Sequence, residues 1–89
     1  MRLDKFLKVS RVIKRRTLAK EVCDGGQVTL NGRSAKAGSE VKTGDVVFIN
    51  FGLRKIRFEI LSVRENVPAK QAGELYSILE ETFENRVVE

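Results

Sequence analysis

The apolar residues change their spacing at "DGG", residues 24–26, and this change limits the folds open to the chain. Before it, four apolar residues recur with the period of an α-helix: Leu18, Ala19, Val22 and Cys23. After it, Val28 and Leu30 alternate with polar residues, as is typical of a strand. Glycine readily takes the left-handed conformation that ends a helix. The sequence therefore predicts a helix over residues 15–24, with all four apolar residues on its buried face, followed by a strand.

Residues 3–10 predict another short helix before it. Leu3, Phe6, Leu7 and Ser10 fall on one side at 100° per residue, and Asp4 lies in the first turn, where a negative charge suits the helix dipole. Residues 11–13 fit either an extension of this helix or a link to the next.

Strands follow the second helix. Asn31 and Gly32 form a strong tight-turn signal after the first strand. The apolar run that begins at Val46 and the alternating residues 54–63 predict a hairpin between 46–51 and 54–63.

The end of the chain predicts a third helix. Pro68 fits a first helical turn, and an apolar stripe opposes an acidic face. The stripe consists of Ala72, Leu75, Tyr76, Leu79 and Phe83. The last four of these are interpreted as residues that pack in the core. We therefore expect an α+β fold, with two N-terminal helices packed on a small antiparallel sheet over residues 1–67. A C-terminal amphipathic helix over 68–89 packs on this domain or extends from it.

The charge is strongly polarised along the chain. The 17 basic and 12 acidic residues give a net charge of +5, distributed as +7 over residues 1–36, +1 over 37–67 and −3 over 68–89. Such a distribution indicates an anionic partner, with nucleic acid the first candidate and an anionic membrane surface the second.

Several classes of protein are disfavoured by composition. One cysteine and no histidine leave no internal disulfide, no zinc cluster and no Ser-His or Cys-His pair. Cys23 lies on an apolar face, which indicates a core residue and not a nucleophile. No apolar run is long enough to span a membrane. We expect a cytoplasmic binding protein that is not an enzyme and needs no metal or cofactor.

The segment "KRRTLAK", residues 14–20, has the densest positive charge. On a helical wheel Arg16 and Lys20 share one polar edge, whereas Arg15 falls within the apolar arc. Arg15 is therefore expected to precede the regular helix or to bend away from it. A helix start with arginine and lysine beside it suits phosphate groups, because its free N–H groups attract anions and arginine forks onto phosphate oxygens. Asp4 is interpreted as a helix-start charge or a brace for Arg2.

Several spaced motifs resemble the S-four RNA-binding domain, named after small-subunit ribosomal protein four. They are "RLDKFL", a basic-Arg-Thr entry followed by Leu-Ala, "GQVTLNG" and "AKAGSEVKTGDVV". Together with the closing "LYSILEE", the chain resembles the RqcP family of ribosome-associated quality control factors and is similar to the heat-shock S-four proteins. The resemblance implies that the two helices and the strand turn bind RNA. It also implies binding to the rRNA of the large ribosomal subunit and to obstructed peptidyl-tRNA. We expect the chain to be a monomer. The role implied is support of C-terminal alanine tailing of stalled nascent chains, with RqcH as a partner on the same particle.

Carried over by position, the resemblance assigns the N-terminal arginine to Arg2, the helix-entry arginine to Arg16, the lysine of "RLDK" to Lys5 and the lysine after the turn to Lys36. Family members vary at Lys8, Arg11, Lys14, Arg15, Lys20 and Arg33. The RNA-binding residues predicted are Arg2, Lys5, Lys8, Arg15, Arg16, Lys20 and Lys36.

Other functions remain open from the sequence. One is a heat-shock-type rescue factor for free large subunits, and another is a detached RNA-binding accessory of an RNA-modifying enzyme. A third is a protein-interaction module that uses the acidic C-terminal region while the basic face is idle.

Overall fold

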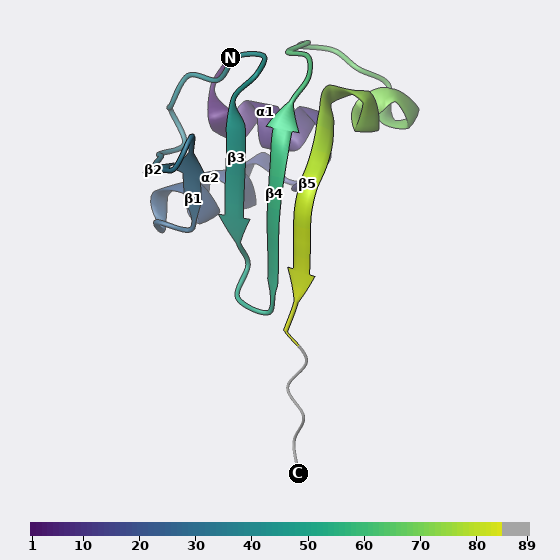
Figure 1. The fold of residues 1–89 in the computed structure, drawn as a ribbon. Coiled ribbons are helices and arrows are strands. Elements are labelled where there is room, and N and C mark those ends of the chain that lie inside the picture. The colour runs from purple at the N-terminus through teal and green to yellow at the C-terminus, as the bar shows by residue number, and fades with distance from the viewer. Residues whose placement is uncertain (85–89) are drawn as a thin grey trace.

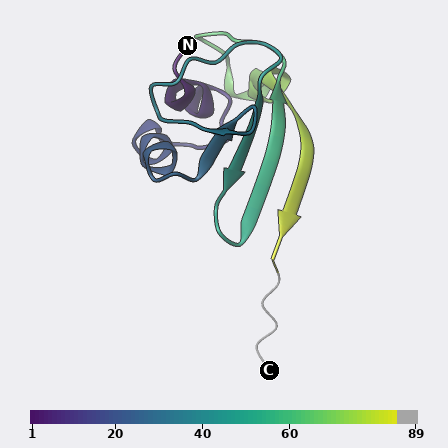
Figure 2. The same ribbon diagram turned by 60° about the vertical axis from the view of Figure 1, so that its left-hand side comes forward.

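Two helices lie on one face of a five-stranded antiparallel sheet in the computed structural model, which describes residues 1–84 (Figures 1 and 2). The strand order is β2-β1-β3-β4-β5. The elements are α1 (Leu3–Val9), α2 (Arg16–Asp24), β1 (Val28–Leu30), β2 (Arg33–Ser34), β3 (Val46–Asn50), β4 (Arg54–Ile60), the 3-10 helix η1 (Ala69–Leu75) and β5 (Tyr76–Phe83). The predicted α+β class, with two helices on an antiparallel sheet, is confirmed.

The link between α1 and α2 is a loop and not a helical extension. Arg11 has a φ of 64°, a left-handed conformation that ends α1. Arg15 is extended, with φ −118° and ψ 131°, and α2 begins at Arg16. The prediction that Arg15 precedes the regular helix is confirmed. The apolar face of α2 is narrower than predicted, because Leu18 is half-exposed while Ala19, Val22 and Cys23 are buried.

The core fills the space between the two helices and the sheet. Phe6 of α1 stacks on Phe58 of β4 with ring centroids 6.4 Å apart, and Tyr76 meets Phe58 edge-on at 5.3 Å. The fully buried members from the sheet alternate along their strands, as expected when one face is covered. They are Val28, Val47, Ile49, Ile56, Phe58 and Ile60. This packing fixes where the polar ends of α1 and α2 lie.

The turn between β1 and β2 is held by its own residues and by β3. Asn31 and Gly32 both have positive φ, 53° and 82°, as a two-residue hairpin turn requires. The Asn31 side chain accepts a hydrogen bond from the N–H of Val46 (2.9 Å) and donates one to Asp45 (3.1 Å). The predicted tight turn is confirmed, and β2 is a strand that the sequence patterns did not predict.

Replacing Gly32 by alanine is expected to lower the free energy of unfolding by about 1 kcal/mol, because alanine is strained at positive φ. A Cβ at this position meets nothing within 4 Å, so the cost comes from the backbone and not from a clash. Urea denaturation followed by circular dichroism measures it. Gly73→Ala is the control, since Gly73 lies in equally open space without a positive φ. Equal effects of the two substitutions would contradict this account.

The predicted hairpin between residues 46–51 and 54–63 is confirmed by the pairing of β3 with β4, although β4 ends at Ile60. The predicted C-terminal helix is wrong for residues 76–83, which form β5 and pair with β4. Only Ala69–Leu75 is helical, as a 3-10 helix, and residues 85–89 of the prediction lie outside the described residues. The edge of β4 carries N–H and C=O groups that form hydrogen bonds with β5. These bonds favour a strand, although the apolar residues are spaced as on a helix.

The expected apolar stripe divides accordingly. Ala72 and Leu75 of η1 are buried, and Tyr76 is partly buried against the core. Leu79 and Phe83 are exposed on β5, so the prediction that they face the core is wrong.

Candidate nucleic-acid interface

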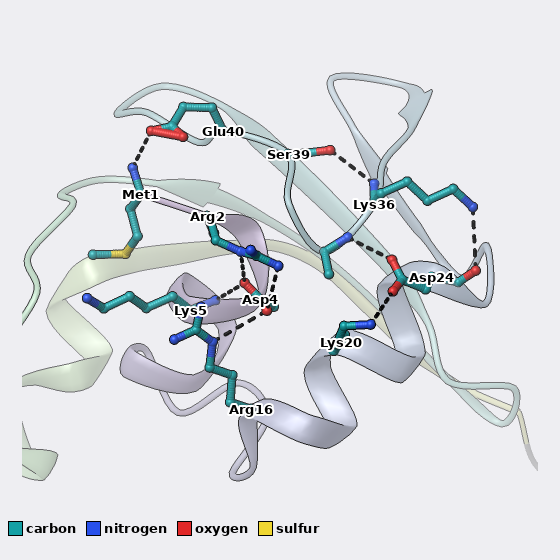
Figure 3. A network of polar contacts seen from close by, with 11 residues as sticks. Met1, Arg2, Asp4, Lys5, Arg16, Lys20, Asp24, Lys36, Ser39 and Glu40 are labelled. Carbon is teal, nitrogen blue, oxygen red and sulfur yellow. Dashed lines mark hydrogen bonds and ion pairs between the residues drawn. The ribbon is translucent and has the colours of Figure 1, made fainter.

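Two arginines at the starts of different helices converge on one buried carboxylate (Figure 3). Arg2, which precedes α1, donates from Nε to Oδ1 of Asp4 at 3.1 Å, and Arg16, the first residue of α2, donates from Nε to Oδ2 at 3.4 Å. The Asp4 side chain is only 3% exposed, whereas those of Arg2 and Arg16 are 51% and 48% exposed. Each guanidinium is therefore held from the inside and keeps donors free on its outer side.

The pKa of Asp4 reflects this arrangement. Burial alone would raise the pKa of the carboxyl, but the hydrogen bonds and charges of Arg2 and Arg16 outweigh burial and lower the pKa below its ordinary value. The N–H of Lys5 also donates to Asp4, at 2.8 Å. Asp4 is thus a charged acceptor that fixes both arginines, and the interpretation of Asp4 as a brace for Arg2 extends to Arg16. We call Arg2 and Arg16 the arginine pair.

The backbone around Arg2 is anchored to the loop before β3. Leu3 donates its N–H to the carbonyl of Ser39 at 2.8 Å, and Asp4 donates to the carbonyl of Ala37 at 3.1 Å. Arg2 itself forms an antiparallel bridge with Glu40. The position of the first arginine therefore depends on a loop more than 30 residues away in sequence.

A second cluster of basic residues surrounds Asp24 at the end of α2. Lys20 Nζ pairs with Asp24 Oδ2 at 3.1 Å, and Lys36 Nζ donates to the backbone carbonyl of Asp24 at 3.4 Å. The N–H of Ala37 donates to Asp24 Oδ1 at 3.1 Å. This bond, followed by the one from Lys20, lowers the pKa of Asp24.

The two clusters adjoin along α2. Arg16 and Lys20 are one turn apart on this helix and so share a face, as predicted. Figure 3 shows Arg2 just before α1, Arg16 and Lys20 along α2, and Lys36 in the loop that follows β2. We call these four residues the basic surface.

The side chains of the other three predicted residues form no ion pair with Asp4 or Asp24. Lys5 pairs with Glu65 at 3.3 Å. Lys8 and Arg15 are exposed, and neither forms an ion pair within residues 1–84. Sequence reasoning missed Asp24 as an organising residue, although its place four residues after Lys20 was a usable signal. Nothing in the sequence indicated Glu65, because its contact with Lys5 depends on the fold.

Cys23 is buried in the core, and burial raises the pKa of its thiol to about 11, as suits a core residue. Residues 1–84 contain no metal-binding group of three or more histidine, cysteine, aspartate or glutamate side chains, and no pocket. None of the helices within these residues has the length and apolar character needed to cross a membrane.

Comparison with known proteins assigns the chain to a family. A sequence profile of the S4 domain matches residues 1–47. The RQC P-site tRNA stabilizing factor of Halalkalibacterium halodurans is 57% identical over 81 residues, which cover 91% of this chain and 92% of that protein. The chain belongs to the S4-domain family, together with the RQC P-site tRNA stabilizing factors. All seven predicted RNA-binding residues lie within the S4 match, whereas β4 and β5 lie beyond it.

Two further relatives are similar over most of the chain. The RQC P-site tRNA stabilizing factor of Bacillus subtilis is 49% identical over 91% of this chain and 94% of its own length. A trimeric structure of Heat Shock Protein 15 from Vibrio cholerae has a TM-score of 0.81 and 32% identity, covering 88% of this chain and 80% of that one. The fold of this chain is therefore shared with that solved structure.

Proposed function

We propose that this S4-domain protein is a non-enzymatic RNA-binding factor of ribosome-associated quality control. The names of its relatives in Halalkalibacterium halodurans and Bacillus subtilis, which are similar over nearly their whole length, support this role. The observation that carries the RNA-binding part is the arginine pair, held by the buried Asp4 with its outer donors exposed. Because the proposed factor acts on ribosomes, we expect it to be located in the cytoplasm.

The proposed targets are rRNA of the large ribosomal subunit and an obstructed peptidyl-tRNA. Arginine forks bind phosphate oxygens through two parallel hydrogen bonds, and the carboxylate behind them removes the cost of orienting them on binding. A protein that contacts both RNAs at once favours one arrangement of the tRNA on the subunit. In this role it supports C-terminal alanine tailing of the stalled chain, with RqcH as a partner on the same particle, and acts as a monomer.

Binding to large subunits that carry peptidyl-tRNA should weaken steeply with salt. Neutralising roughly five phosphates gives a log–log slope of about −4.5 for a duplex-like target, because bound counterions are released. Quantitative pelleting with purified bacterial subunits between low and physiological salt measures the slope. An affinity that does not change with salt would overturn the proposal.

The alternative of a heat-shock-type rescue factor rests on the similarity to Heat Shock Protein 15. The sequence identity to that protein is 32%, against 57% for the quality-control factor of Halalkalibacterium halodurans. The same pelleting assay separates the two. The quality-control role predicts tighter binding when peptidyl-tRNA is present, whereas equal binding to free subunits would support the rescue role.

A further inference from the structure

β5 is the outermost strand at the end of the sheet away from the basic surface. It pairs with β4, and its outer edge pairs with no other strand within residues 1–84. Eight residues of strand extend about 26 Å. Every residue after Tyr76 in this strand is exposed. Such an edge presents unpaired N–H and C=O groups that can pair with another chain.

The edge also carries apolar side chains that the core does not use. Ile78, Leu79 and Phe83 are 46%, 53% and 66% exposed. The strand is tied at its end to the β3–β4 loop, where the N–H of Glu84 donates to the carbonyl of Leu53 at 2.7 Å, and Leu53 is itself half-exposed. The apolar groups therefore lie on an ordered surface and not on a loose end.

Arg54 orders the same end of the sheet. Its guanidinium lies 5.6 Å from the ring centre of Phe51 and 5.9 Å from that of Phe83, and it pairs with Glu81 at 2.8 Å. The carboxylate of Glu81 is therefore already paired with Arg54. Glu80 lies opposite Arg57 of β4 in the sheet register, and Glu84 follows the end of β5. Both are exposed and form no ion pair within the described residues, so their carboxylates can pair with basic side chains of a partner.

The charge decides which occupant fits. Edge strands are commonly protected by charges and bulges, and β5 has both, with a register irregularity opposite Arg57 and Phe58. Antiparallel pairing of two copies of β5 would bring their glutamates together, which is unfavourable. Glu80 and Glu84 would also repel the phosphate groups of RNA. A segment with lysine or arginine beside apolar residues would neutralise Glu80 and Glu84 and cover the exposed apolar groups.

We propose that the outer edge of β5 binds an extended, basic protein segment, which adds to the sheet as a sixth strand. Main-chain hydrogen bonds supply the affinity, and the exposed glutamates and apolar groups select the segment. Figure 2 shows the two helices on one side of the molecule and β5 on the other, so the edge and the basic surface can be occupied together. The proposal does not depend on which RNA the basic surface binds.

The test uses the full chain and a fluorescein-labelled ten-residue peptide in which lysine and valine alternate. Fluorescence anisotropy measures binding, and amide hydrogen exchange locates it. We expect the peptide to bind and to slow exchange in β5. Glu80→Lys combined with Glu84→Lys should weaken binding about tenfold or more, because attraction becomes repulsion at both positions. The same peptide with alternate backbone nitrogens methylated should not bind.

A matched charge control is Glu21→Lys with Glu65→Lys, which changes the net charge equally at exposed positions outside β5. This variant should bind the peptide like the wild type. Equal weakening by both variants, undiminished binding of the methylated peptide, or exchange protection outside β5 would overturn the proposal. So would a dimer in sedimentation equilibrium that also protects β5 from hydrogen exchange, or protection of β5 by large-subunit RNA alone.

Discussion

Replacing Arg2 and Arg16 together by alanine is expected to weaken binding to large subunits carrying peptidyl-tRNA by about 100-fold at physiological salt. Both guanidinium forks that are proposed to bind RNA phosphates are then lost. The log–log salt slope should become shallower by about 1.8, because two fewer phosphates are neutralised. Pelleting across a salt series measures both quantities. Replacement by lysine should restore most of the slope but less of the affinity, since lysine keeps the charge and lacks the fork.

The control for this prediction removes two positive charges elsewhere. Arg64→Ala with Lys70→Ala makes the same change in net charge at exposed positions outside the basic surface. Circular dichroism checks that each variant is folded, because the alanine pair leaves Asp4 without its partners. If both double variants weaken binding equally, general charge and not the arginine pair accounts for RNA binding.

Replacing Asp4 by asparagine is expected to lower the free energy of unfolding at pH 7 by about 1–3 kcal/mol. This loss of stability is smaller than that from breaking a fully buried ion pair, because both arginines are about half-exposed. The pKa of Asp4 is lower in the folded chain than its ordinary value of 3.8. The stabilisation is therefore present above pH 3.8 and is lost as pH falls through the folded pKa.

Urea denaturation of the wild type and of Asp4→Asn between pH 7 and pH 3 tests this linkage. The two stabilities should converge as the wild-type carboxyl becomes protonated. Glu74→Gln, at an exposed carboxyl, should differ from the wild type by less than about 0.5 kcal/mol. A difference between wild type and Asp4→Asn that stays constant with pH would show that the charge of Asp4 does not stabilise the fold.

The N-terminal half was predictable because local rules and tertiary packing agree there. The wheel position of Arg15 conflicted with a helix, and the chain is extended at that residue. The turn at Asn31 and Gly32 needs positive φ, which these residues tolerate best. The agreement ends at Leu18, whose spacing fits a buried face although the two helices leave it half-exposed.

The C-terminal third was predicted less well because the spacing of its apolar residues is compatible with either a helix or a strand. Leu75, Leu79 and Phe83 are four residues apart, as on one helix face. The open edge of β4 decides for a strand, and that edge exists only once the sheet has formed. The same holds for the candidate site. The sequence indicated the basic residues, but that Arg2 and Arg16 share a carboxylate depends on how α1 packs against α2.

Sharing Asp4 makes the arginine pair one energetic unit. Truncating either arginine leaves the carboxylate to the other, so each single substitution changes the geometry of the residue that remains. Effects of residues that share a partner do not add. An alanine scan that treats each position separately would therefore misjudge this surface. Double-mutant cycles that pair Asp4 with each arginine are needed to assign the contribution of each residue.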